Sequence, residues 1–135
     1  MKILFCLLLS YVSLSPAFLN PYKIYPIVKE ICTYRGVSYE GSNTIDLSNM
    51  DLESLNGISV LLVELDGEEV WIDQVPRLRI VASNNKLKSI PGELKMLNCI
   101  AIDLTHNDEL EIPDWMWESK QFHLYCCYGF FRRSV

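Results

Sequence analysis

The sequence predicts an α/β solenoid in which every coil adds one short strand to a parallel sheet. A phrase of two aliphatic residues around one spacer, Asn or a stand-in three positions on, and a further aliphatic or Phe occurs about five times between Ile45 and Phe130. Successive copies begin 18, 17, 22 and 20 residues apart, close to the period of coiled repeat proteins. Because side chains alternate along a strand, both aliphatics of a copy face one side of the sheet. Stacked coils would then share a continuous core.

The third and fourth copies are the most regular. They read Ile80-x-Ala82-x-x-Asn85-x-Leu87 and Ile102-x-Leu104-x-x-Asn107-x-x-Leu110. These two stretches resemble the leucine-rich repeat. The resemblance implies parallel strands on a concave face and irregular, 3-10 or short helical segments on a convex face. It also implies that the concave face binds partners.

The Asn of each phrase is expected to support the turn after the strand. Its amide carries donors and acceptors that pair with backbone groups inside the coil. We predict a structural ladder of Asn85 and Asn107, with Cys127 as a stand-in in the fifth copy, Phe122-x-Leu124-x-x-Cys127. The first two copies, which begin at Ile45 and Val63, carry Met50 and Glu68 instead. We expect their turns to be less well ordered and Glu68 to lie outside the coil.

Three regions are predicted: a signal peptide over 1–17, an N-terminal capping segment over 18–42 and the repeat domain over 43–135. Met1-Lys2, an apolar run to about Leu14 and Ser15-Pro16-Ala17 have the layout of a secretory leader. The run is short for a membrane span, so a retained anchor is the weaker alternative. A secreted or secretory-pathway protein follows, with no membrane span after removal of the leader.

The first and last coils of a solenoid each have an apolar end that a further element must cover. Pro26 to Tyr34 is predicted to form a short helix that caps the first coil, because Ile27, Val28, Ile31 and Cys32 would share an apolar stripe. No such element follows the last copy, and the stretch from Tyr125 to Phe131 is apolar. Two interpretations stay open: this edge associates with another molecule, or the chain is a truncated piece of a longer array.

Four cysteines remain after the leader: Cys32, Cys99, Cys126 and Cys127. An even number in an oxidising compartment permits disulfides. The repeat pattern favours free thiols, with Cys99 and Cys127 buried and Cys126 exposed.

Catalytic patterns are scarce. The sequence has only two His, and it contains neither a phosphate-binding loop motif nor a Cys-x-x-Cys pair. The spacing of His123, Cys126 and Cys127 matches no standard zinc site. No enzyme, cofactor or metal is predicted. The formal net charge of −5 argues against nucleic acid as a partner.

A protein-binding surface is the predicted function. The residues between and beside the paired aliphatics would line the concave face, and the predicted contacts are Asp46, Glu64, Asp66, Arg79, Asp103, His123 and Tyr125. Their mild acidity favours a partner with a basic patch. The alternative is a structural or self-assembling module joined through the C-terminal end.

Overall fold

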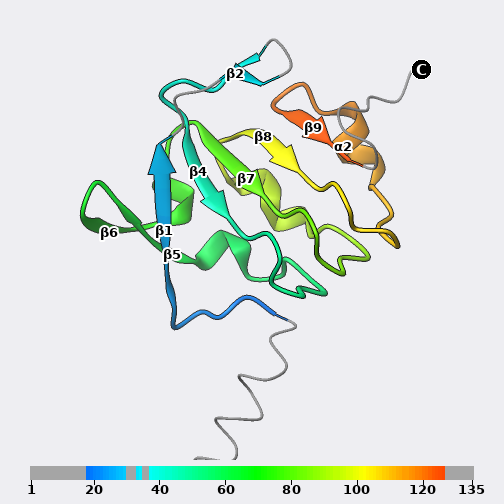
Figure 1. The fold of residues 1–135 in the computed structure, drawn as a ribbon, viewed down its shortest axis with the longest axis horizontal. Helices are drawn as coiled ribbons and strands as arrows, with labels where there is room; N and C mark the ends of the chain where they lie inside the picture. Colours follow the sequence, from blue (N-terminus) through cyan, green and yellow to red (C-terminus); the bar gives the residue numbers. More distant parts are fainter. Residues whose placement is uncertain (1–17, 30–32, 35–36, 127–135) are drawn as a thin grey trace, which may run out of the picture.

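The protein is an α/β protein with one mixed seven-stranded sheet and few helices (Figure 1). The computed structural model describes residues 18–29, 33–34 and 37–126 of the 135-residue chain. The sheet order is β6-β5-β1-β4-β7-β8-β9, and β2 and β3 form a separate pair. The strands are β1 (Ile24–Lys29), β2 (Thr33–Tyr34), β3 (Val37–Ser38), β4 (Asn43–Asp46), β5 (Leu62–Leu65), β6 (Glu68–Trp71), β7 (Leu78–Val81), β8 (Cys99–Asp103) and β9 (His123–Tyr125). The helices are η1 (Ile58–Val60), η2 (Ile72–Gln74), η3 (Gly92–Met96) and α2 (Asp114–Glu118).

The strands β4, β7, β8 and β9 are parallel and stack in register. Ile45 lies opposite Ile80, Ile80 opposite Ile102, and Ile102 opposite Leu124. The fifth copy of the phrase therefore begins at Leu124, two residues later than predicted. A slip of two preserves the direction of every side chain, so Phe122 and Leu124 are both buried. Cys127 lies outside the described residues, and so does the predicted signal peptide.

A single main core lies on one side of this sheet. The aliphatic side chains of the parallel strands point into this core. Each short helix adds one buried side chain to the same cluster: Ile58, Ile72, Leu94 and Met116. The short helices therefore cover one face of the sheet. Among the described residues, no helix has the length and apolar character needed to cross a bilayer.

The side chain of Asn85 pairs the buried backbone of two neighbouring turns. Its Oδ1 accepts hydrogen bonds from the backbone N–H groups of Met50 and Leu52, both at 3.0 Å. Its Nδ2 donates to the carbonyls of Leu47 at 2.9 Å and Ala82 at 3.1 Å. Asn85 thus joins the turn after β7 to the turn after β4.

Asn107 repeats this arrangement one coil further on. Its Oδ1 accepts from the N–H of Leu87 at 3.1 Å, and its Nδ2 donates to the carbonyls of Ala82 and Leu104, both at 3.0 Å. The predicted pairing role is confirmed for both asparagines, which are buried. The turn at Met50 is also paired, because the amide of Asn85 reaches it.

The residue at the same place in each of three turns has a positive φ. Asn49, Asn84 and His106 have φ values of 57°, 54° and 60°, and each directly precedes the ladder position. Asn and His tolerate this left-handed backbone better than most residues. A common backbone bend therefore turns the chain inward after β4, β7 and β8.

The predicted second copy is wrong. Val63 and Leu65 belong to β5 and Glu68 belongs to β6, and these strands form an antiparallel hairpin instead of a coil. Asp66 and Gly67, with φ values of 52° and 82°, make its two-residue turn. Asp-Gly between two strand-like runs is a strong signal for this turn. Glu68 is exposed, as predicted.

The predicted capping helix is also wrong. Ile24–Lys29 forms β1, which pairs parallel with β5 and antiparallel with β4. Tyr25 is buried and Ile27 half-buried, while their neighbours in the strand are exposed. This alternation is that of a strand with one covered face. Segment 18–42 therefore contributes a strand to the same sheet, alongside the first parallel strand.

A carboxylate joins two of the short helices. Oε1 of Glu93 in η3 accepts hydrogen bonds from the N–H of Ser59 in η1 at 3.0 Å and from its hydroxyl at 3.1 Å. The bond from the Ser59 backbone is the largest of the effects that together hold the pKa of Glu93 below its ordinary value of 4.5, against a smaller opposing effect of burial. This contact ties the coil after β4 to the coil after β7.

We expect Asn85→Ala to lower the free energy of unfolding by about 3 kcal/mol, because the buried N–H of Leu52 and the part-buried N–H of Met50 lose their acceptor. Asn107→Ala leaves the buried N–H of Leu87 without its acceptor and should lower the free energy of unfolding by about 2 kcal/mol. Urea unfolding of the variants measures both. The exposed Asn56→Ala is the control. Equal stability of the parent and the Asn85 variant would contradict the pairing role.

We expect Glu93→Gln to lower the free energy of unfolding by about 1 kcal/mol at pH 7, through weaker acceptance of the Ser59 bonds. Since the pKa of Glu93 is lower in the folded state, its charge stabilises the fold above pH 4.5, and this contribution is lost as the pH falls through the folded-state pKa. The difference between parent and variant should shrink below pH 4.5. A difference that stays constant with pH would contradict this assignment.

Candidate functional site

The sheet has a face opposite the main core, which we call the open face. Six of the seven predicted contact residues stand on it, namely Asp46, Glu64, Arg79, Asp103, His123 and Tyr125, because each alternates with a residue that points into the core. The seventh, Asp66, lies in the hairpin turn and forms an ion pair with Lys29 at 3.6 Å. The structure therefore brings most of the predicted set to one face, across strands from both parts of the sheet.

Four carboxylates on the open face form a line across the strands, which we call the acidic row: Glu69, Glu64, Asp46 and Asp103. Glu69 lies opposite Glu64, and Glu64 opposite Pro26. The register of β1 with β4 continues the line to Asp46, which is aligned through Val81 with Asp103. At about 4.8 Å per strand, Asp46 and Asp103 are about 10 Å apart, as are Glu64 and Asp46.

Two carboxylates of the acidic row also hold turns. Oδ1 of Asp46 accepts from the N–H of Ser48 at 3.0 Å, and Oδ1 of Asp103 accepts from the N–H of Thr105 at 3.0 Å. The hydroxyls of Ser48 and Thr105 donate to the same oxygens at 2.5 and 2.7 Å. These bonds fix both carboxylates relative to the strand ends, so this half of the row has a defined geometry.

Part of the open face is covered by the chain itself. Tyr39 is buried against Ala101 and Tyr125, and its hydroxyl is hydrogen-bonded to that of Tyr125. The guanidinium carbon of Arg79 lies 5.1 Å from the centre of the Tyr39 ring, a cation–π contact. Tyr125 is 2% exposed, so its prediction as a contact for a partner is wrong. The face left open contains Asp46, but not Tyr125.

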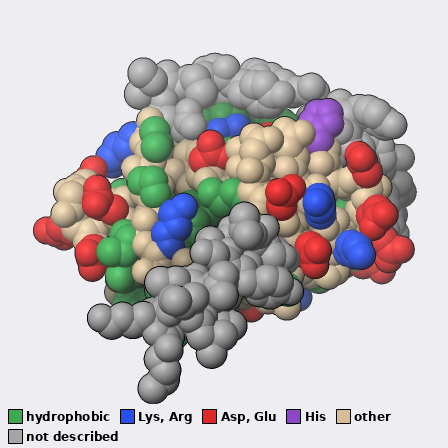
Figure 2. Space-filling model, turned by 60° about the horizontal axis from the view of Figure 1, so that its bottom comes forward, with side chains coloured by type: hydrophobic (Ala, Val, Ile, Leu, Met, Phe, Trp, Pro, Cys, Tyr) green, Lys and Arg blue, Asp and Glu red, His purple; other side chains and the backbone are tan. Residues whose placement is uncertain are grey.

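The β5–β6 end of the open face is both apolar and acidic. Trp71 is 53% exposed, Val28 57% and Ile24 40%. Ile24 lies opposite Leu62, and Leu62 opposite Trp71, so an apolar line runs beside the acidic row. Figure 2 shows hydrophobic and acidic side chains gathered on this side of the molecule, at the left. The exposure of Trp71 follows from the β5–β6 hairpin, which replaces the coil that the phrase beginning at Val63 predicts.

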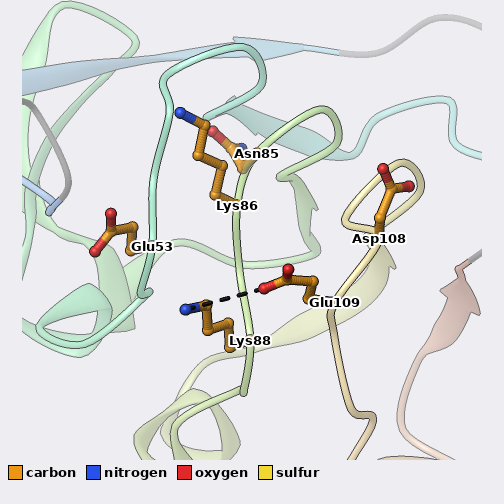
Figure 3. A pocket seen from close by; sticks show the side chains of 6 residues that line it. All are labelled: Glu53, Asn85, Lys86, Lys88, Asp108 and Glu109. Carbon is orange, nitrogen blue, oxygen red and sulfur yellow. Dashed lines mark ion pairs between the residues drawn. The ribbon is translucent and has the colours of Figure 1, made fainter.

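A cleft of 310 Å³ lies beside the turns that follow the parallel strands β4, β7 and β8 (Figure 3). It is lined by Glu53, Asn85, Lys86, Lys88, Asp108 and Glu109. Lys88 forms an ion pair with Glu109 at 3.9 Å and Lys86 one with Asp51 at 3.6 Å, all largely exposed. Such exposed pairs contribute about 0–1 kcal/mol, and the amide of Asn85 is engaged in the ladder. The cleft therefore offers little organised chemistry for a ligand.

The described cysteines lie in the interior. Cys99 is a buried free thiol, as predicted, and burial raises its pKa to about 12. Its Sγ lies 3.2 Å from the carbonyl oxygen of Ala101, to which it donates. Cys126 is buried as well, which contradicts its predicted exposure, because the corrected register gives it the place of an inward aliphatic. Within the described segments, no three His, Cys, Asp or Glu side chains are grouped so as to hold a metal ion.

No protein-family model matches the chain, and no curated protein or solved structure is detectably similar to it.

We expect Tyr39→Ala to lower the free energy of unfolding by about 3 kcal/mol, because it removes an aromatic ring buried on the open face. Tyr39→Phe keeps the ring, loses only the hydroxyl bond to Tyr125 and should cost about 1 kcal/mol. Urea unfolding compares the two variants. An alanine variant as stable as the phenylalanine variant would show that the ring adds nothing to the fold.

Proposed function

We propose that this chain is a small exported leucine-rich repeat protein whose open face binds a protein partner that carries a basic patch. The acidic row is the observation that carries the proposal. Four carboxylates share one line of the sheet, and the exposed positions Asp46, Glu64 and Glu69 are available to a partner.

The solenoid part of the proposal is supported by three features that recur with the repeat. These are the parallel register of four strands, the side-chain amides of Asn85 and Asn107, and the left-handed backbone at the preceding residues. All three recur because each successive turn directs backbone N–H and C=O groups inward at the same position, where they need hydrogen-bond partners. In such a stack, the open face of the parallel strands is the concave face.

The charge on the open face favours a basic partner. Within the described ranges, lysines form ion pairs with Asp51, Asp66 and Glu109, whereas no such pair involves the acidic row. Glu64 and Glu69 are cross-strand neighbours about 5 Å apart, and the other carboxylates of the row are about 10 Å apart, about one Debye length, so the members of the row repel one another. A partner cation relieves that repulsion, which adds association rate and specificity more than affinity.

Export is the location proposed, on the strength of the apolar leader over 1–17. The proposed role is binding alone, without cofactor, nucleic acid or catalysis. Mass determination of the chain secreted by a eukaryotic host tests the leader, since cleavage after Ala17 leaves Phe18 as the first residue.

The binding proposal is tested by capture of partners on the immobilised chain. We expect Asp46→Asn/Glu64→Gln/Asp103→Asn to reduce capture of the specific partner at least about tenfold, because three charges leave the face. The two Asn side chains keep an oxygen acceptor for the turns at Ser48 and Thr105. Binding is measured by quantitative mass spectrometry at two salt concentrations.

The matched control removes three carboxylates from the cleft instead: Glu53→Gln/Asp108→Asn/Glu109→Gln. This variant should capture the partner as the parent does. Loss of capture in the control but not in the open-face variant would move the binding site to the cleft and overturn the proposal.

A further inference from the structure

The outer strand of the described sheet, β6, has backbone groups directed away from its neighbour. The N–H of Ile72 donates to the carbonyl of Leu61 at 2.9 Å, which fixes the phase of the β5–β6 pairing. In an antiparallel pair alternate residues bond across, so Val70 faces β5 whereas the N–H and C=O of Glu69 face outward. In Figure 1, β6 lies at the free end of the sheet. Such an edge can pair with an additional strand.

The side chains of β6 determine which residue types an added strand must carry to pair with it. Glu68 and Glu69 are exposed, Val70 is half-buried and Trp71 is 53% exposed. A strand added antiparallel would read, from its own N-terminus, two apolar residues opposite Trp71 and Val70 and then two basic residues opposite Glu69 and Glu68. Cross-strand aromatic and opposite-charge pairs are favourable contacts.

The chain itself contains this order once, in Phe130-Phe131-Arg132-Arg133. We propose that these four residues of one molecule pair antiparallel with β6 of a second molecule. Phe130 would then lie opposite Trp71, Phe131 opposite Val70, and the two Arg opposite the two Glu. Phe130 would also extend the apolar line of Trp71, Leu62 and Ile24 on the open face.

The distance that the chain can span beyond Cys126 requires the pairing to be between two molecules. Phe130 lies four residues after Cys126 and can extend at most about 14 Å from it, and Arg133, seven residues after it, at most about 25 Å. Six strand spacings of about 4.8 Å, roughly 29 Å, separate β9 from β6. One molecule therefore cannot serve its own β6, and the contact is head to tail.

The acidic edge also selects against the simplest competitor. Two β6 strands from different molecules would bring four carboxylates, those of Glu68 and Glu69 from each, to one junction. Like charges at an edge oppose such pairing, whereas a strand with two Arg neutralises them.

Association is measured by sedimentation equilibrium of the purified chain over a range of concentrations in reductant. We expect the apparent mass to rise reversibly with concentration. Arg132→Glu/Arg133→Glu and Glu68→Arg/Glu69→Arg should each weaken association at least about tenfold, because like charges then face each other. The chain that carries all four changes should associate as the parent does.

A matched control, Glu109→Arg/Glu111→Arg, makes the same charge change at two exposed residues away from β6 and should associate normally. A photo-reactive benzoylphenylalanine at position 130 should cross-link to residues 68–71 of another molecule in a mixture of isotope-labelled and unlabelled chains. A monomer at every concentration, or association that survives both charge reversals, would overturn the proposal.

This inference does not depend on the proposed function. The open-face variant Asp46→Asn/Glu64→Gln/Asp103→Asn retains both β6 and the Phe130–Arg133 segment, so it should associate as the parent does. Loss of association in that variant would count against the β6 contact, whereas loss of partner capture alone would not.

Discussion

The pairing of buried backbone groups by the amide of Asn85 is the constraint on which the stacked strands depend. The turn after each parallel strand points N–H and C=O groups inward, where water cannot pair them. One amide bonds the Met50 and Leu52 N–H groups of the preceding turn and the Ala82 carbonyl of its own. Since each Asn serves the turn before it, the turn after β4 needs no Asn of its own. This accounts for Met50 at the first ladder position, because no parallel strand precedes β4 in this part of the sheet.

The same stacking determines the surface. Parallel strands in register place equivalent residues in lines, so charges at one position of the phrase add up across the sheet. Asp46 and Asp103 belong to such a line. They also share a local role, since each accepts a hydrogen bond from the turn that follows its strand, at Ser48 or Thr105. Tyr39 then limits the usable face by covering Ala101 and Tyr125. The candidate binding surface is therefore what stacking exposes and the Tyr39 contact leaves open.

Local patterns predicted the parts of the fold that local chemistry decides. Asn85 and Asn107 were identified because an inward amide at a turn has few substitutes. The stretch from Val63 to Val70 fitted both a coil and a hairpin, and the Asp66-Gly67 turn, which was overlooked, decides between them. Ile27 and Val28 fitted a helix stripe, yet pairing with β4 and β5, remote in sequence, makes their segment a strand. The cover of Tyr125 by Tyr39, 86 residues apart, had no local signal at all.

A parallel stack cannot close on itself, so each end must be covered or paired. At the β4 end, β1 pairs antiparallel with the first parallel strand and is followed by the β5–β6 hairpin. The free edge is thereby moved from an apolar strand of the stack to a short strand with two exposed carboxylates, Glu68 and Glu69. Acidic side chains disfavour pairing with another acidic strand, but they leave a basic strand free to pair. The end of the sheet is thus open to selective association, because its protection is electrostatic rather than steric.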